Sequence, residues 1–68
     1  MESIYRTIDD HRYVNSMDEH ELEMHTTELE DAYAFLAGRE YPKMAAERRR
    51  LPDLIKRCLR RVESVTVN

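Results

Sequence analysis

Apolar residues recur at helical spacing in two segments of the chain, 17–37 and 43–64, and charged residues fill the opposite sides. The turn between the two segments, 38–42, begins with Gly38 and ends with Pro42. Glycine suits the left-handed residue that ends a helix, and proline suits the first position of the next helix. Helices joined by so short a turn pack antiparallel. The pattern therefore predicts an all-α fold built on an antiparallel helical hairpin.

The predicted helices carry further signals at their ends and in their interior. Ser16 and Glu19 match a capping box, in which each side chain bonds the backbone N–H of the other residue. Pro52 lies inside the second helix, where it lacks a backbone donor and disfavours helical geometry at Leu51. We therefore expect a kink or a break there, and a tail, 65–68, that is frayed or extended.

The N-terminal segment, 1–15, gives a weaker signal. Ile4 and Ile8 are one helical turn apart, but two short strands that turn at Asp9 and Asp10 would also fit. We favour irregular or short helical structure that packs its apolar side chains against the hairpin. The whole chain then forms one small helical domain.

The first predicted helix is apolar on two sides. Besides the leucine face that packs in the hairpin, it carries a second strip, formed by Met17, Met24 and Phe35, on nearly the opposite side. The other helix of a hairpin covers only one side of this helix. Full burial of a large apolar side chain contributes about 1.5 to 3 kcal/mol to stability, which the strip would lose if it stayed exposed. Either the segment 1–15 covers the second strip, or another chain does.

This surplus of apolar surface predicts a non-catalytic protein-binding module, such as a small inhibitor, adaptor or accessory subunit of the kind that phages and mobile elements encode. A chain of 68 residues has a small core, and its single cysteine excludes an internal disulfide, so association with another chain is the source of added stability that remains. The expected partner is a larger protein, and a homodimer is the second possibility. The predicted partner-binding residues are the second strip and two nearby acids: Met17, Met24, Glu28, Asp31 and Phe35.

Charge divides the chain into an acidic and a basic half. Residues 1–38 hold ten acids and two bases (−8), and residues 39–68 hold nine bases and four acids (+5), which together give the net charge of −3. We expect the two helices to pair some of these charges, although exposed pairs contribute only about 0 to 1 kcal/mol each.

The basic helix allows a second function, nucleic-acid binding. The stretch 42–65 contains no Asn, Gln or aromatic residue to read or stack bases, so this function ranks second. Its predicted residues are Arg49, Lys56, Arg57, Arg60 and Arg61.

No motif indicates catalysis or a cofactor, and we expect no enzyme activity, cofactor or metal. Cys58 falls on the apolar face of its helix, where a buried, inert thiol is expected. Glu21, His25 and Glu28 share one side of the first helix, but such a set is more often a hydrated acidic edge than a metal site. Because no apolar run has the length of a membrane span and no signal peptide is visible, we expect a cytoplasmic protein without membrane contact.

The stretches "GREYP", "AAERRR" and "LPDLIKRCLRR" follow the first helix in this order. A long helix, a turn with Tyr and Pro, a short helix and a basic helix occur in the same order in the theta subunit of bacterial replicative DNA polymerase, which this chain resembles in that respect. The resemblance implies, as an alternative, a non-catalytic accessory subunit bound to the proofreading exonuclease.

Overall fold

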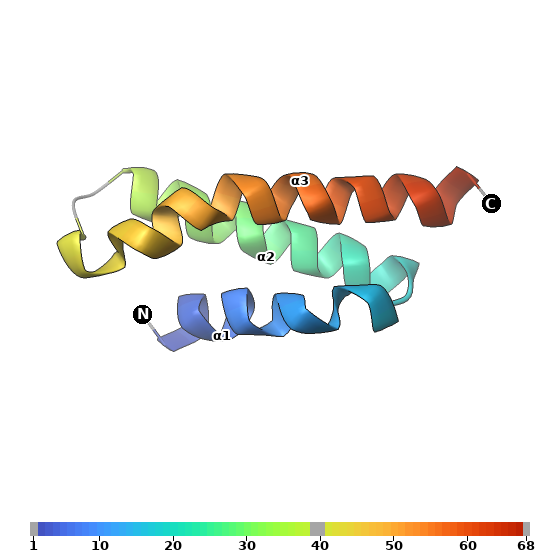
Figure 1. Ribbon diagram of the computed structural model, residues 1–68, viewed down its shortest axis with the longest axis horizontal. Coiled ribbons are helices and arrows are strands. Elements are labelled where there is room, and N and C mark those ends of the chain that lie inside the picture. Colours follow the sequence, from blue (N-terminus) through green and yellow to red (C-terminus); the bar gives the residue numbers. More distant parts are fainter. Residues whose placement is uncertain (1, 39–40, 68) are drawn as a thin grey trace.

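The computed structural model describes residues 2–38 and 41–67, which are almost entirely helical and contain no strand (Figure 1). The two long helices, α2 and α3, pack antiparallel against each other, and the N-terminal helix packs against both. The predicted all-α hairpin with a packed N-terminal segment is therefore confirmed. None of the described helices is long and apolar enough to cross a membrane. In chain order, the elements are α1 (Glu2–Asp10), η1 (His11–Ser16), α2 (Glu19–Ala37), η2 (Pro42–Met44) and α3 (Ala45–Val67), where η denotes a 3-10 helix.

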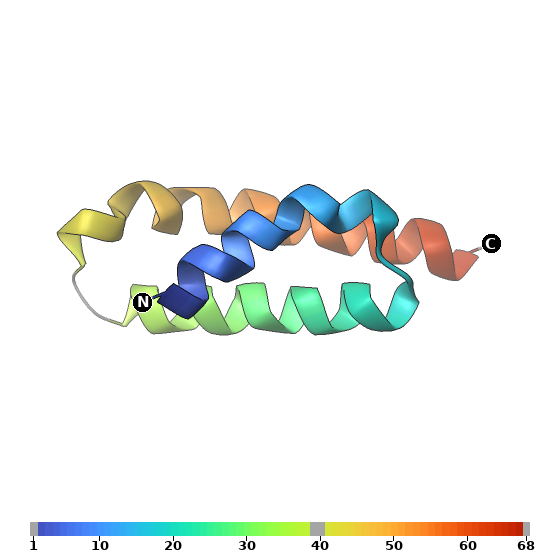
Figure 2. The same cartoon turned by 90° about the horizontal axis from the view of Figure 1, so that it is seen from below.

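Helix α1 and η1 lie diagonally across the seam between α2 and α3 (Figure 2). The segment is helical, so the alternative of two short strands is wrong. Ile4 and Ile8 point into the core and are buried, because they lie on the same face of α1. One cluster contains the buried apolar residues of α1, α2, η2 and α3: Ile4, Ile8, Leu22, Leu29, Ala32, Leu36, Met44, Leu51, Leu54 and Cys58.

Helix α2 begins two residues later than predicted. Its capping box is formed by Asp18 and Glu21, since Asp18 Oδ1 accepts the Glu21 N–H at 2.8 Å and Glu21 Oε1 accepts the Asp18 N–H at 3.3 Å. The predicted box of Ser16 and Glu19 is wrong, because Ser16 is the last residue of η1. Both pairs have the same spacing, and the length of η1 decides between them.

The turn between the long helices differs from the prediction at its first residue. Gly38 ends α2 in the right-handed conformation (φ −81°, ψ −3°), so the predicted left-handed stop is wrong. Residues 39–40 of the predicted turn lie outside the described residues. Pro42 occupies the first position of the next helical element, η2, as predicted.

Helix α3 continues past Pro52 without a break, so the predicted break is wrong. A proline in a helix interior costs about 3 kcal/mol, because one backbone hydrogen bond is lost and the ring crowds the preceding turn. Leu51 and Leu54, on either side of Pro52, are both buried in the core. Burial of each leucine contributes about 1.5 to 3 kcal/mol, which offsets the cost of the proline.

Helix α3 also covers most of the predicted tail, 65–68. The helix extends to Val67, and Val65 packs against the core. The tail is therefore helical rather than frayed or extended over the residues that the structure describes, and residue 68 lies outside them.

Replacing Pro52 with alanine should stabilise the fold, because alanine restores the backbone donor and favours helical geometry. We expect the free energy of unfolding, measured by urea denaturation, to rise by about 1 to 3 kcal/mol. Arg49→Ala, at an exposed position of the same helix, is the control and should change it by less than about 0.5 kcal/mol. An unchanged or lower value for Pro52→Ala would contradict this account.

Candidate functional site

Two neighbouring hollows form one groove between α1 and α2, which we call the α1–α2 groove. The hollows adjoin each other, because Asp10 and Glu28 line both of them. All five residues predicted to bind a partner line this groove: Met17, Met24, Glu28, Asp31 and Phe35. The structure therefore brings together residues that the sequence places up to eighteen positions apart.

The N-terminal segment covers the second apolar strip only in part. Met17 is half-buried and packs against the core. Met24 keeps 51% of its surface exposed and Phe35 keeps 42%, although the Phe35 ring also stacks on Tyr41 with a centroid distance of 5.5 Å. The strip therefore remains a partly open apolar surface inside the α1–α2 groove.

The charged side chains that line the α1–α2 groove are mostly acidic. Asp10, Glu21, Glu28 and Asp31 line it, and Arg6 is the one Lys or Arg among its described lining residues. Four acids and one base leave a balance of −3. The groove thus combines an apolar surface with a negative field, which suits a ligand that is apolar and cationic.

A buried pair of histidines fixes η1 to α2. His11 Nδ1 lies 3.2 Å from His25 Nε2, and the two residues are only 9% and 4% exposed. One ring donates its N–H while the other accepts with a lone pair. The contact therefore requires at least one of the two rings to be neutral.

The surroundings of the pair disfavour its protonation. Burial lowers the pKa of His11, and the charges of His25, Arg57 and Arg50 lower it further. Burial also lowers the pKa of His25. The carboxylates of Glu28 and Asp10 oppose that shift without cancelling it.

The sequence did not predict this pair. His25 was grouped with Glu21 and Glu28, but its ring turns inward to His11. In the part of the chain that the structure describes, no group of three or more His, Cys, Asp or Glu side chains is placed to hold a metal. The spacing of His25 from the leucines of α2 indicates the buried face, whereas no signal in the sequence identifies its partner.

A second buried polar contact joins α2 to α3. Thr26 Oγ1 lies 2.7 Å from Leu22 O and 2.8 Å from Cys58 Sγ. Cys58 is fully buried, which confirms the predicted position of the thiol. The thiol is enclosed by this contact and by core side chains, so its role in the fold is structural.

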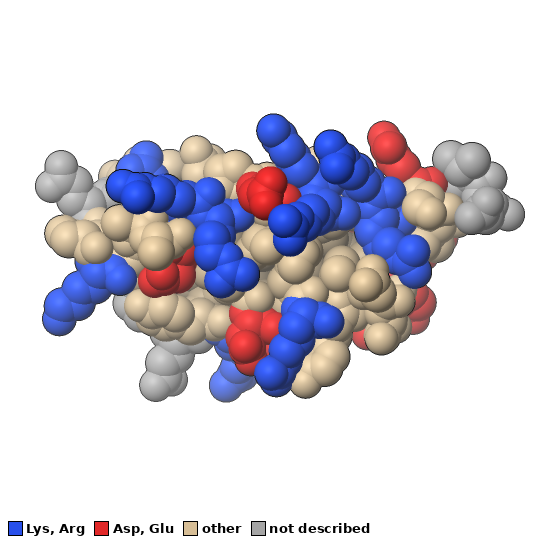
Figure 3. All heavy atoms as spheres, in the orientation of Figure 1, with Lys and Arg blue, Asp and Glu red and all other residues tan. Residues whose placement is uncertain are grey.

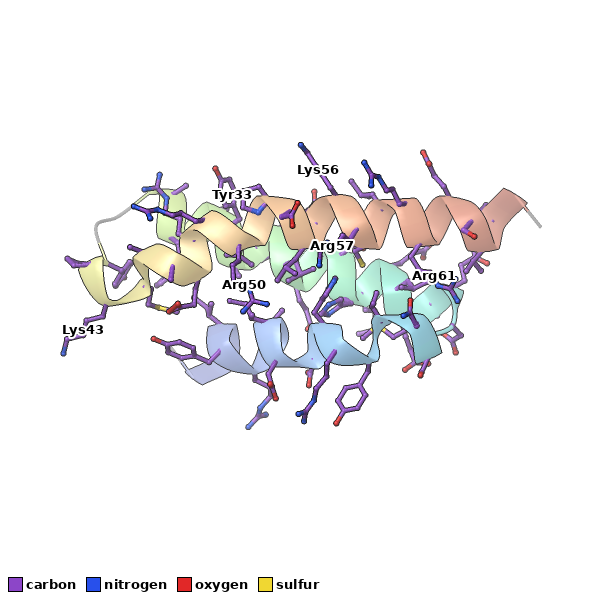
Figure 4. The ribbon with its side chains drawn as sticks, viewed as in Figure 1. Tyr33, Lys43, Arg50, Lys56, Arg57 and Arg61 are labelled. Carbon is purple, nitrogen blue, oxygen red and sulfur yellow. The ribbon has the colours of Figure 1, made fainter. Side chains whose placement is uncertain are left out.

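Basic side chains gather along α3 and on its side toward α1 (Figure 3). Of the residues predicted to bind nucleic acid, Arg57, Arg60 and Arg61 line a hollow between η1 and α3, which we call the η1–α3 hollow. Arg49 and Lys56 do not line it. Figure 4 shows Lys56 pointing away from α1, whereas Arg57 and Arg61 point toward α1 and η1. The structure thus brings three of the five predicted residues together.

Two further arginines belong to this face and were missed. Arg12, from η1, lines the η1–α3 hollow. Arg12 and Arg50 also line an adjoining groove between α1 and α3, the α1–α3 groove. The sequence could not place Arg12 here, because its contribution depends on where η1 packs.

The expected pairing of charges between the two long helices is wrong for the residues that the structure describes. Their ion pairs are local: Arg12 with Asp9 at 3.5 Å, and Arg57 with Asp53 at 3.2 Å. Neither pair joins α2 to α3. The acidic and basic surfaces therefore face solvent as separate regions.

Comparison of the chain with protein-family models, with the curated proteins and with the solved structures found no match. The similarity to the theta subunit stays a prediction from three sequence stretches. We therefore infer the function from the two surfaces alone.

The histidine pair predicts that acid destabilises the fold. Because folding lowers both pKa values, the unfolded chain takes up protons first, as the pH falls through the ordinary pKa of about 6.5. The free energy of unfolding should therefore be highest above this pH and fall between pH 7 and pH 5. The double variant His11→Gln, His25→Gln should show a smaller fall in urea denaturation across this range.

The control for this experiment is His20→Gln, which removes the exposed third histidine. The control retains the buried pair, and both variants retain every carboxylate of the chain. It should keep the pH dependence of the parent chain. The same pH dependence in all three proteins would contradict the role assigned to His11 and His25.

Proposed function

We propose that this chain is a non-catalytic binding module that holds a basic amphipathic helix of a larger protein in the α1–α2 groove. The observation that supports this function is the presence, in one groove, of the half-exposed Met24 and Phe35 beside four carboxylates. In this role the chain acts as an inhibitor, adaptor or accessory subunit.

The apolar part of the groove has the length of a short helix. Met24 and Phe35 are eleven residues apart on α2, which corresponds to about 16 Å along the helix axis. A partner helix lying along the groove would place apolar residues against both, at intervals of three and four positions. The flexible side chain of Met24 adapts its shape to such residues.

The charge of the groove selects the flanks of the partner helix. Its balance of −3 attracts lysine and arginine and repels a helix with acidic flanks. Exposed ion pairs add little affinity, so the carboxylates contribute mainly to specificity and to the rate of association. The proposed partner segment is therefore apolar on one face and basic at its edges.

The proposal includes a cytoplasmic location. Cys58 is the single cysteine of the sequence and is buried as a free thiol. A chain without disulfides is typical of a reducing compartment.

Two helical peptides of about 18 residues, with the same apolar face but with either Lys or Glu at its edges, test the proposal. Fluorescence anisotropy should detect binding of the Lys peptide and not of the Glu peptide. The double variant Met24→Ser, Phe35→Ser should weaken binding at least about tenfold, equivalent to about 1.4 kcal/mol, with unchanged helicity in circular dichroism.

Leu59→Ser is the matched control, because Leu59 is a large apolar residue that is 48% exposed on α3, outside the groove. It should leave the binding of the Lys peptide unchanged. Equal binding of the two peptides, or an equal loss in the control, would contradict the proposal.

A second copy of the chain is the competing occupant of the groove. Sedimentation velocity at micromolar concentration should show a monomer. A dimer that Met24→Ser with Phe35→Ser dissociates would show that the groove joins two copies, and this result would overturn the proposed partner.

A further inference from the structure

The η1–α3 hollow is a concentration of positive charge built from two distant parts of the sequence. Arg12 of η1 and three arginines of α3, Arg57, Arg60 and Arg61, line it. None of its described lining residues is Asp or Glu. His11, Asn15 and Ser64 add polar groups to its lining. Guanidinium groups in such number suit phosphate oxygens, which they bind through paired hydrogen bonds.

Arg61 lines the hollow and has no counter-charge among the described residues. Its Nη2 donates to Asn15 O at 3.4 Å, and its Nε is buried with no hydrogen-bond partner among the described residues. Neither Arg60 nor Arg61 takes part in an ion pair within the part of the chain that the structure describes. A partly desolvated cation of this kind is electrostatically costly, and an anion in the hollow would lower that cost.

The other two arginines are available to a ligand despite their ion pairs. Arg12 pairs with Asp9, and Arg57 pairs with Asp53, within one turn of the same segment. All four side chains are more than 60% exposed, and exposed pairs contribute little free energy. A phosphate can therefore replace the carboxylate at either guanidinium.

The basic surface is longer than one phosphate. Arg50, Arg57 and Arg61 point from α3 toward α1 and η1 (Figure 4). The first and the last of them are eleven positions apart on α3, about 16 Å along its axis. In the α1–α3 groove the arginines are accompanied by Asp9 and Glu47, so the positive charge is greatest in the η1–α3 hollow.

An aromatic side chain stands beside this row of arginines. Tyr5 lines the α1–α3 groove with Arg50 and Arg57, and it is 46% exposed. A positive groove with an exposed aromatic ring is the arrangement that binds single-stranded nucleic acid, in which phosphates meet cations and a base stacks on the ring. We propose that the η1–α3 hollow and the α1–α3 groove bind a single strand in this way, without reading its sequence, independently of the α1–α2 groove.

The test measures the binding of a fluorescent oligothymidylate of about 20 nucleotides across a salt series. Binding should weaken steeply as salt rises. Arg57→Gln with Arg61→Gln should reduce the affinity at least about tenfold and make the slope of log K against log salt shallower by about 1.4, or 0.7 for each lost phosphate contact. The slope separates a lost contact from a smaller folded fraction.

The matched control is Arg49→Gln with Lys56→Gln, which removes the same charge from exposed residues of α3 that do not line the hollow. It should reduce the affinity by less than about threefold, since only the long-range field changes. Tyr5→Leu should weaken the binding of the single strand by about fivefold or more, because a base can no longer stack on the ring. Met24→Ser with Phe35→Ser should leave this binding unchanged, which separates it from the proposed protein partner.

Three results would overturn the inference. Equal losses of affinity in the two charge variants would show general electrostatic attraction without a defined binding site. Tighter binding of a duplex of the same length would show that the ligand is not a single strand. Polyglutamate that competes as well as the oligonucleotide would show an acidic protein surface as the ligand.

Discussion

The packing of α1 across the seam between α2 and α3 is the constraint on which the rest of the structure depends. Two amphipathic helices bury one side each and leave the edge of their core open. Ile4 and Ile8 close that edge, and burial of each contributes about 1.5 to 3 kcal/mol, a large share of the 5 to 15 kcal/mol typical of a folded domain. The contact between His11 and His25 then holds the end of the segment in place.

The same packing gives the molecule two different faces. On one side of α1, the carboxylates of α2 border the half-exposed Met24 and Phe35. On the other side, η1 brings Arg12 to the arginines of α3. Because the described ion pairs are local, the two surfaces keep their opposite charges. The two proposed ligands would therefore meet different surfaces of the chain.

The sequence predicted the hairpin because the period of its apolar residues is a local property of each helix. Features that depend on packing between elements could not be predicted from the sequence. The sequence offers two capping boxes with identical spacing, and only the length of η1 selects Asp18 over Ser16. Pro52 suggests a break by its own chemistry, but the burial of Leu51 and Leu54 keeps α3 continuous.

The candidate sites show the same limit. The second apolar strip could be found from the sequence, since Met17, Met24 and Phe35 share one face of the predicted helix 17–37. The basic residues of α3 could be found too, but not which of them converge, because that depends on Arg12 and the position of η1. The histidine pair joins residues fourteen positions apart in different elements, and no periodicity connects them.

The central claim is that α1 and η1 are docked on the hairpin in solution, and nuclear Overhauser measurements test it most directly. We expect cross-peaks at neutral pH between the imidazole protons of His11 and His25, and between the methyl groups of Ile8 and Leu54, which line the same groove and share the core. If both sets are absent while cross-peaks between α2 and α3 persist, the N-terminal segment is not docked. The two surfaces would then lose the wall that they share.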